Sequence, residues 1–148
     1  MNFDFLSDSE TSSRKPARQD RPMILSVDDS LNTLFSRYKV LNSEGYAVLS
    51  ATDGVQALQI FYQNIVDLVL LDFDLQGMHG GLVAEAMKAA APDVPIIVVS
   101  GVEVPEHYIA MCDGYVRKGD GPEVLLGAIR QLLSPASLPA IDQSLKVS

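Results

Sequence analysis

The stretch Leu68-Val69-Leu70-Leu71-Asp72 decides the fold. Four apolar residues in succession end on a carboxylate. A strand of this kind must be covered on both faces, which is typical of a central strand in a parallel sheet. A polar residue at its carboxyl end lies where ligands bind in open parallel sheets. The stretch therefore predicts the centre of an α/β sheet and also the edge at which its chemistry takes place.

Outward from this stretch, short apolar runs alternate with segments of helical periodicity as far as residues 23 and 133. The apolar runs predict strands at 23–27, 47–51, 68–71, 96–99 and 115–117. Helices are expected between them and after the last one, and the helix at 106–112 is short. This alternation predicts βα units built on a parallel sheet.

The first expected helix is amphipathic, with Ser30 suited to cap its start and Gly45 placed where a helix commonly ends. Its apolar face is formed by residues at helical spacing, namely Leu31, Leu34, Phe35, Tyr38 and Leu41.

The chain has 148 residues, of which 47% are hydrophobic, enough for one domain with a real core. We expect this domain at residues 22–133, between a polar N-terminal arm at 1–21 and a C-terminal tail at 134–148. The charges of residues 1–22 cancel, so the formal net charge of −8 lies in the remainder. An acidic domain repels nucleic acid and suits a cation site.

The single cysteine and the absence of long apolar segments limit the compartment and the metal chemistry that we expect. Cys112 is the single cysteine, which excludes an internal disulfide and a thiol-based metal cluster. The N-terminus has no apolar stretch that could serve as a signal sequence, and no segment is long and apolar enough for a membrane helix. We therefore expect a cytoplasmic protein that binds neither nucleic acid nor membranes.

Polar side chains follow four of the expected strands, at the point where each strand ends. They are Asp28 and Asp29, Asp72, Ser100 and Lys118. The carboxyl ends of parallel strands meet at one edge of the sheet, so these residues should converge. Clustered carboxylates repel each other unless a cation neutralises them, and Mg²⁺ favours carboxylates together with water and phosphate oxygens.

Such a site can accept a phosphoryl group. A carboxylate beside the metal can attack an activated phosphoryl group, and Lys118 and Ser100 can hold its oxygens. A backbone carbonyl from the turn after Asp72 can complete the coordination shell of the metal. Each residue also has a plain structural explanation: Asp28 and Asp29 as a helix cap and a solvated acid, Ser100 as a turn residue and Lys118 as a surface lysine. His79 and His107 are read as solvent-facing rather than as ligands.

From about Met23 to Leu133 the sequence resembles the receiver domain of two-component response regulators. The shared motifs are an acidic pair, an apolar strand before an aspartate, a glycine eight residues later and two short strand-end motifs: Asp28-Asp29, Asp72, Gly80, Ser100-Gly101 and Tyr115-Val116-Arg117-Lys118. The resemblance implies a flavodoxin-like, doubly wound sheet of five parallel strands in the order 2-1-3-4-5.

The resemblance also implies roles for individual residues. Asp72 would be the phosphoacceptor, and Asp28, Asp29, Asp72 and the backbone carbonyl of Asp74 would hold Mg²⁺ or Mn²⁺. Ser100 and Lys118 would bind the phosphoryl group, and Ser100 and Tyr115 would form the switch. Asp74 and Val102 would flank the phosphoryl group and tune dephosphorylation.

Three features depart from the family pattern. Gln76 and Gly119 stand where the family usually has proline. The bond between the family's lysine and proline is commonly cis, and a cis bond before glycine is costly, so we expect Lys118 to be less firmly placed. The interval from Ser100 to Tyr115 is about one helical turn short. We therefore expect the fourth helix, part of the surface that normally carries the signal, to be short or irregular.

The function expected from these residues is a stand-alone, single-domain response regulator rather than a turnover enzyme. Phosphate would arrive on Asp72 from a histidine kinase, a phosphotransfer protein or a small phosphodonor. Output would pass through an unidentified downstream protein or a homodimer.

Two alternatives belong to other classes. One is an interaction module that keeps the fold but signals without phosphorylation, favoured by the Lys118-Gly119 step and the short helix. The other is a phosphohydrolase, because Asp72-Phe73-Asp74 looks like the Asp-x-Asp motif of haloacid-dehalogenase-type phosphatases. In this chain, however, the acidic pair Asp28-Asp29 precedes the strand that carries the nucleophile, whereas in that phosphatase family the acidic pair follows this strand.

Overall fold

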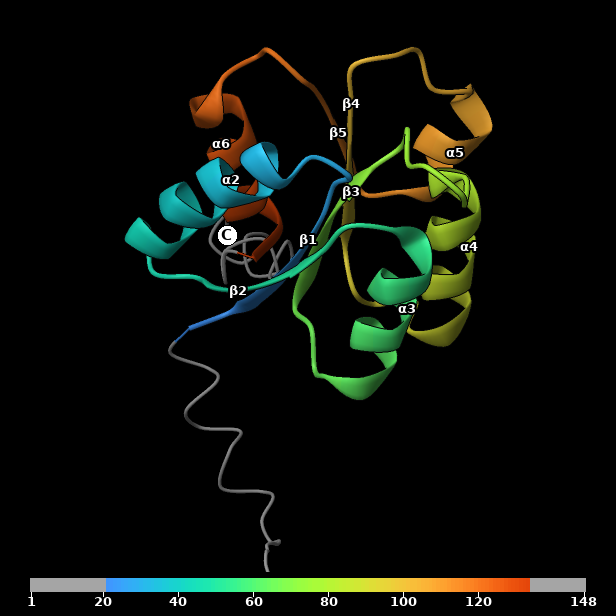
Figure 1. Cartoon of the computed structure of the whole chain (residues 1–148), viewed down its shortest axis with the longest axis horizontal. Helices are drawn as coiled ribbons and strands as arrows, with labels where there is room; N and C mark the ends of the chain where they lie inside the picture. The colour runs from blue at the N-terminus through green and yellow to red at the C-terminus, as the bar shows by residue number, and fades with distance from the viewer. Residues whose placement is uncertain (1–20, 134–148) are drawn as a thin grey trace, which may run out of the picture.

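The computed structural model describes residues 21–133, and within them a five-stranded sheet is covered by helices on both faces (Figure 1). The strands are β1 (Met23–Val27), β2 (Ala47–Ala51), β3 (Leu68–Asp72), β4 (Ile96–Ser100) and β5 (Gly114–Arg117). The helices are α2 (Leu31–Ser43), α3 (Gly54–Gln63), α4 (Gly80–Ala90), α5 (Glu106–Met111) and α6 (Pro122–Leu133). Apart from Arg21, the expected arm at 1–21 lies outside the described residues, as does the expected tail at 134–148.

All strand pairs are parallel, and the order is β2-β1-β3-β4-β5. The predicted flavodoxin-like, doubly wound topology is therefore confirmed. Helices α2 and α6 cover one face of the sheet, and α3, α4 and α5 lie on the other (Figure 1). No helix among residues 21–133 is long and apolar enough to cross a membrane.

β3 is the centre of the sheet, as its sequence predicts. All five of its residues are buried, between β1 on one side and β4 on the other. Val69 and Leu71 join the apolar core under α3 and α4, whereas Leu68 and Leu70 join the core under α2 and α6. Because side chains alternate along a strand, Asp72 continues the row of Leu68 and Leu70 on the α2 and α6 side.

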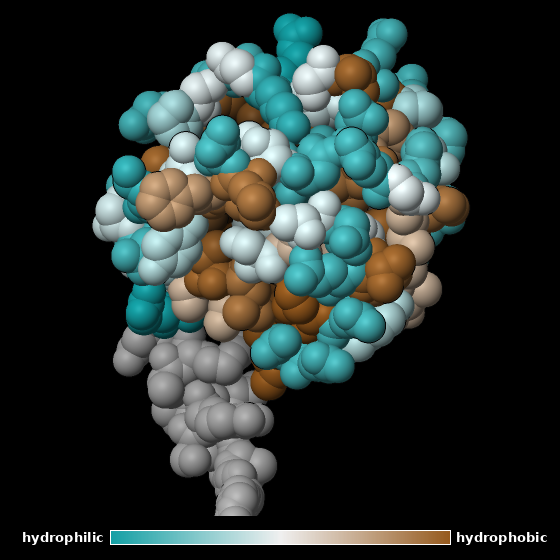
Figure 2. Space-filling model, viewed as in Figure 1, coloured by the Kyte–Doolittle hydropathy of each residue, from teal (hydrophilic) through white to brown (hydrophobic). Residues whose placement is uncertain are grey.

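The packing face of α2 differs from the expected one. Leu34, Arg37 and Leu41 are the buried residues of this helix. Leu31, Phe35 and Tyr38 are 71%, 62% and 42% exposed, respectively. Figure 2 shows apolar side chains at the surface where Figure 1 labels α2. The expectation for these three residues is therefore wrong: the buried stripe is rotated around the helix and has an arginine at its middle. The cap is as predicted, since Ser30 Oγ accepts a hydrogen bond from the backbone N–H of Thr33.

The fourth helix of the fold, α5, is short, as predicted from the chain length between Ser100 and Tyr115. It has six residues, and none of them is buried. The segment is held instead by Val104, which packs with Phe73 and Val98, and by the half-buried Tyr108 and Tyr115 around them. The face of the domain formed by α4 and α5 is therefore built with less helix than the resemblance implies.

Candidate functional site

Three carboxylates meet at the carboxyl edge of the sheet. Asp72 ends β3 and Asp28 directly follows β1, and because Val27 pairs with Leu71, the two aspartates lie side by side. Asp28, Asp29 and Asp72 each offer a carboxylate oxygen, and these oxygens lie within 4.8 Å of one another. Asp28 is 0% and Asp72 1% exposed, whereas Asp29 is exposed to solvent. The structure thus brings together the trio predicted from the sequence.

Backbone N–H groups orient both buried carboxylates. Asp28 Oδ1 accepts a hydrogen bond of 2.9 Å from the N–H of Ser30. Asp72 Oδ1 accepts one of 3.1 Å from the N–H of Asp74. Such Asx-type turns are local, and they hold each carboxylate in place without any ligand. The remaining oxygens of both residues point to the same place, where a cation is required to balance them.

Lys118 provides one such cation. Its Nζ lies 3.1 Å from Asp28 Oδ2 and 3.1 Å from Asp72 Oδ2. The backbone N–H of Lys118 donates to the carbonyl of Ser100 and so extends the pairing of β4 with β5. The next residue, Gly119, has a φ of +98°, a value that proline cannot adopt. Glycine in place of the family's proline therefore belongs to a different turn, and Lys118 still reaches both carboxylates from it.

The pKa values of Asp72 and Lys118 are both raised, but for different reasons. Burial raises the pKa of Asp72, and so does the charge of Asp28, against the hydrogen bonds from Asp74 and Lys118. Burial lowers the pKa of Lys118, but its hydrogen bonds and ionic contacts with Asp28 and Asp72 outweigh it, and the net pKa is raised. The lysine therefore stays charged at neutral pH.

A second cation, Arg37, reaches the site from α2 and was not predicted from the sequence. Its Nη2 lies 3.5 Å from Asp28 Oδ2, and its Nη1 donates a 3.1 Å hydrogen bond to Ser26 Oγ. Burial lowers the pKa of Arg37, opposed by the charges of Asp28 and Asp72. The signal was available: position 37 shares a helical stripe with Leu34 and Leu41, and a charged residue in a buried stripe needs a partner.

Of the other predicted site residues, Asp74 contacts Asp72 through its backbone N–H, whereas the Ser100 hydroxyl is bonded within its own loop. Ser100 is 1% exposed, and its Oγ donates to the carbonyl of Val102 at 2.7 Å and accepts from the N–H of Val102 at 3.0 Å. Val102 and the side chain of Asp74 are exposed. Tyr115 is half-buried and packs beside Phe73, Val98 and Val104.

The two histidines are exposed, as expected, but His79 also has a structural role. Its Nδ1 accepts a hydrogen bond from the N–H of Gly81 and caps the start of α4. Its ring contacts Phe73 edge-on at 4.6 Å between centroids. His107 stacks on Tyr108, with centroids 4.0 Å apart.

Gly80, eight residues after Asp72, allows the start of α4 to lie directly against the backbone at the end of β3. A Cβ at this position would lie 2.6 Å from the carbonyl oxygen of Phe73 and 2.8 Å from that of Asp72. Both obstacles are backbone atoms, so they cannot rotate away. The residue is therefore required by close approach rather than by a special backbone angle.

We expect Gly80→Ala to destabilise the domain by about 2 kcal/mol, because the added methyl group forces backbone atoms apart. The measurement is urea unfolding followed by circular dichroism. Gly127→Ala is the matched control, since Gly127 also lies in a helix but a Cβ there meets nothing within 4 Å. Alanine at 127 should stabilise by about 0.5–1 kcal/mol. Equal effects of the two substitutions would contradict the close approach at Gly80.

The fold and the acidic site define a class of signalling domain. The sequence model of the response regulator receiver domain matches residues 24–130. The chain belongs to this family. Receiver domains are phosphoacceptor signalling domains of two-component systems rather than turnover enzymes, and they bind Mg²⁺ at an acidic pocket.

Curated relatives are longer than this chain. The aerobic respiration control protein ArcA of Escherichia coli (strain K12) is 32% identical over 117 residues, which cover 76% of this chain and 49% of ArcA. The probable transcriptional regulator ycf27 of Guillardia theta is 29% identical over 134 residues, which cover 88% of this chain and 52% of ycf27. The chain thus spans about half the length of these relatives.

Solved structures agree with the fold. A CheY-like receiver domain protein from Methanospirillum hungatei JF-1 is 30% identical, with a TM-score of 0.72 over 75% of this chain and 92% of the other. The response regulator TrrA from Thermotoga maritima, solved in complex with Mg²⁺-BeF, is also 30% identical. It has a TM-score of 0.72 over 76% of this chain and 99% of TrrA.

The donor set of this chain fits a divalent cation of the magnesium type. Three carboxylates offer hard oxygen ligands within one small volume, and Mg²⁺ is held in proteins by one or two carboxylates, waters and phosphate oxygens. Lys118 and Arg37 supply two positive charges against three carboxylates. The site therefore keeps an excess of negative charge for a metal to balance.

Proposed function

We propose that this chain is a phosphorylation switch that accepts a phosphoryl group on Asp72. The observation that carries the proposal is the pairing of Asp72 with Asp28, two buried carboxylates joined by Lys118 at the edge where β1 and β3 end. A buried charge cluster of this kind is costly to a fold, which favours a functional role over a structural one.

In this proposal Asp72 is the nucleophile. One of its carboxylate oxygens forms a bond to phosphorus, and the bond from phosphorus to the donor's leaving group breaks, with the electron pair leaving on the donor. The product is an acyl phosphate. Asp28, Asp29, Asp72 and the backbone carbonyl of Asp74 would hold Mg²⁺ or Mn²⁺, and the metal would supply charge compensation for the phosphoryl oxygens. The charged side chain of Lys118 moves from the two carboxylates to a phosphoryl oxygen and pairs with it.

Ser100 and Tyr115 are proposed as the switch. In this structure the Ser100 hydroxyl is bonded within its own loop to Val102. Donating to a phosphoryl oxygen requires the hydroxyl to give up its hydrogen bond to the Val102 carbonyl, which would loosen the loop after β4. Tyr115 packs against the cluster of Phe73, Val98 and Val104, and Val104 lies in that loop, so a change there can reach the exposed surface.

The test is incubation of the full chain with acetyl phosphate and Mg²⁺, followed by intact mass measurement. We expect one phosphoryl adduct that forms with Mg²⁺ and not with EDTA. Absence of an adduct, together with absence of Mg²⁺ binding in a calorimetric titration, would overturn the proposal in favour of the interaction module. Steady release of phosphate from a small ester would support the phosphohydrolase instead.

Asp74 is proposed to set the lifetime of the phosphorylated state. The side chains of Asp74 and Val102 are exposed and are proposed to flank the phosphoryl group, where a carboxylate can orient an attacking water. We expect the adduct of Asp74→Ala to decay several-fold more slowly, because orienting a water contributes less than the roughly 10²–10⁴-fold of a full general base. Decay is followed by intact mass after removal of the donor. Equal decay rates in the two proteins would contradict the assignment.

The partners follow from the same proposal. A histidine kinase or a phosphotransfer protein supplies the phosphoryl group in the cytoplasm, and an unidentified downstream protein or a second copy of the chain receives the signal. Output is proposed to pass by protein contact. The short α5, with no buried residue, favours an output surface different from that of receivers with a full-length fourth helix. It is also the observation that favours the phosphorylation-independent interaction module.

A further inference from the structure

Arg37 lies where the packing of α2 calls for an apolar side chain. The helix faces the sheet through Leu34, Arg37 and Leu41, and the arginine side chain is 8% exposed. A buried guanidinium group destabilises a fold unless carboxylates and hydrogen bonds compensate for its lost hydration. Apolar packing therefore does not explain why an arginine is buried here. The explanation has to come from the polar groups that Arg37 contacts.

Both partners of Arg37 belong to β1 and its end. Nη1 donates to Ser26 Oγ at 3.1 Å, and Nη2 lies 3.5 Å from Asp28 Oδ2. Ser26 and Asp28 are both 0% exposed and, two residues apart, share one face of the strand. Arg37 thus joins a polar residue within the core to the buried carboxylate of the acidic site.

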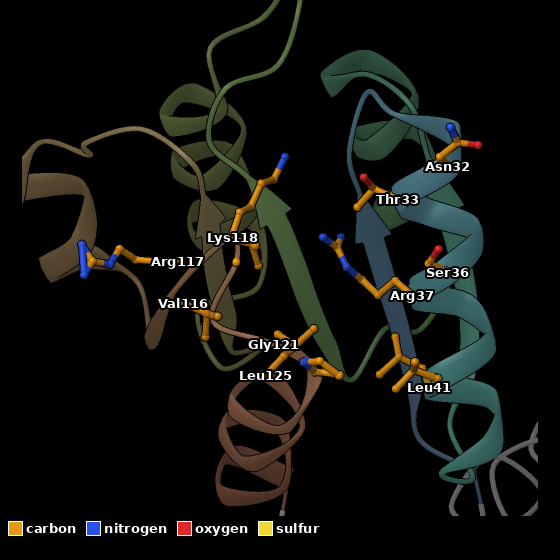
Figure 3. Close-up of a pocket in the computed structure, with 14 residues that line it drawn as sticks. Asn32, Thr33, Ser36, Arg37, Leu41, Val116, Arg117, Lys118, Gly121 and Leu125 are labelled. Atoms are coloured by element: carbon orange, nitrogen blue, oxygen red, sulfur yellow. The ribbon is translucent and has the colours of Figure 1, made fainter.

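Both oxygens of Asp28 already have partners. Oδ1 accepts from the N–H of Ser30, and Oδ2 is shared by Lys118 and Arg37. Figure 3 shows the two cationic side chains extending from opposite sides toward the region between α2 and the loop after β5. The Lys118 side chain is 35% exposed and also forms an ion pair with Asp72. Arg37, in contrast, is buried and is held in place by its hydrogen bond to Ser26. When Lys118 turns to a phosphoryl group, Arg37 remains on Asp28.

We propose that Arg37 is a built-in counter-ion of Asp28 that keeps the acidic site folded without metal and lowers its affinity for divalent cations. It is a positioning residue, because it acts through Asp28. A divalent cation that uses Asp28 must share the carboxylate with a fixed positive charge. This inference rests on the proposed metal site and adds to it a residue that limits metal binding.

A cavity beside Arg37 makes the proposal testable by substitution. It has a volume of about 540 Å³ between α2 and the α6 side of the sheet, and its lining includes Arg37, Leu41, Val99, Lys118 and Leu125. A side chain of different shape at position 37 therefore has room to adjust. Arg37→Met keeps the length of the buried stem and removes the charge, so it tests the charge rather than the packing.

The first experiment is calorimetric titration of the full chain with Mg²⁺. We expect Arg37→Met to bind Mg²⁺ roughly three- to tenfold more tightly, the effect of removing one nearby, partly screened charge. Arg130→Met is the matched control: it removes an arginine that pairs with Glu44 in an exposed ion pair, and its affinity should stay within about twofold of the wild type. Unchanged or weaker binding by Arg37→Met would overturn the proposal.

The second experiment measures thermal unfolding of the metal-free proteins and needs neither metal binding nor phosphorylation. Arg37→Met should lower the melting temperature, because Asp28 loses its anchored partner. In an Asp28→Asn background the same substitution should raise the melting temperature, because Arg37 there lacks its carboxylate. If the Asp28→Asn protein melts higher than Asp28→Asn/Arg37→Met, the counter-ion role is wrong. This comparison decides the matter even if Arg37→Met alone does not fold, and even if Asp72 accepts no phosphoryl group.

Discussion

Asp72→Asn is expected to form no phosphoryl adduct at all under conditions in which the wild type forms one. The amide oxygen of asparagine is a poor nucleophile, and the neighbouring Asp28 is held by Lys118 and Arg37 and cannot take its place. Intact mass after incubation with acetyl phosphate and Mg²⁺ measures the loss. Asp93→Asn removes an exposed carboxylate from the turn before β4 and should leave the adduct unchanged. An adduct of undiminished yield on Asp72→Asn would place the phosphoacceptor elsewhere.

The same substitution should stabilise the metal-free domain at neutral pH. The pKa of Asp72 is raised, mainly by burial, so the folded state binds the proton more tightly than the unfolded state does. Stability therefore falls as pH rises from the unfolded value of 3.8 through the raised folded value, and the full penalty applies above it. Asparagine has no such penalty.

Thermal unfolding across pH in the absence of metal checks this sign. The advantage of Asp72→Asn should be full near pH 7 and should vanish below about pH 3.8, where Asp72 is protonated in both states. A lower melting temperature for Asp72→Asn at pH 7 would show that the ion pair with Lys118 outweighs burial. A higher one, with no adduct, separates loss of function from loss of fold.

The fold was predictable because its determinants are local and repeated. Leu68-Val69-Leu70-Leu71 is apolar on both faces, which is typical of a central strand, and alternating strands and helices then leave few topologies. The short α5 follows from chain length alone. The packing face of α2 was not predictable in the same way, since Leu31, Phe35 and Tyr38 have the same helical spacing as the stripe that is buried.

The site was predictable to the level of which residues meet, but not of how they are bonded. Strand ends placed Asp28, Asp72 and Lys118 together, because backbone register decides that. The hydroxyl of Ser100 is bonded to Val102, and a side-chain torsion of this kind is not encoded in residue spacing. Arg37 was missed because the apolar pattern of its helix was assigned to the wrong stripe.

Lys118→Met is expected to slow adduct formation roughly 10²–10³-fold, the usual effect of losing one preorganised charge at a transition state. It should also destabilise the metal-free domain, since Oδ2 of Asp28 and Oδ2 of Asp72 lose the cation that joins them. Saturating Mg²⁺ should restore much of the stability but not the rate, because metal replaces the charge between the carboxylates and not the contact to the phosphoryl group.

The pH dependence of this loss of stability follows from the raised pKa of Lys118. Burial lowers this pKa, but the contacts with Asp28 and Asp72 raise it by more. Its contribution to stability is fully present below the unfolded value of 10.5 and disappears as pH rises through the folded value. The difference between wild type and Lys118→Met should therefore persist from neutral pH to about pH 10.5. Lys39→Met removes an exposed lysine of α2 and serves as the control for net charge. A Lys118→Met protein as stable as this control would mean that Arg37 alone balances the carboxylates, and Lys118 would then act only on the phosphoryl group.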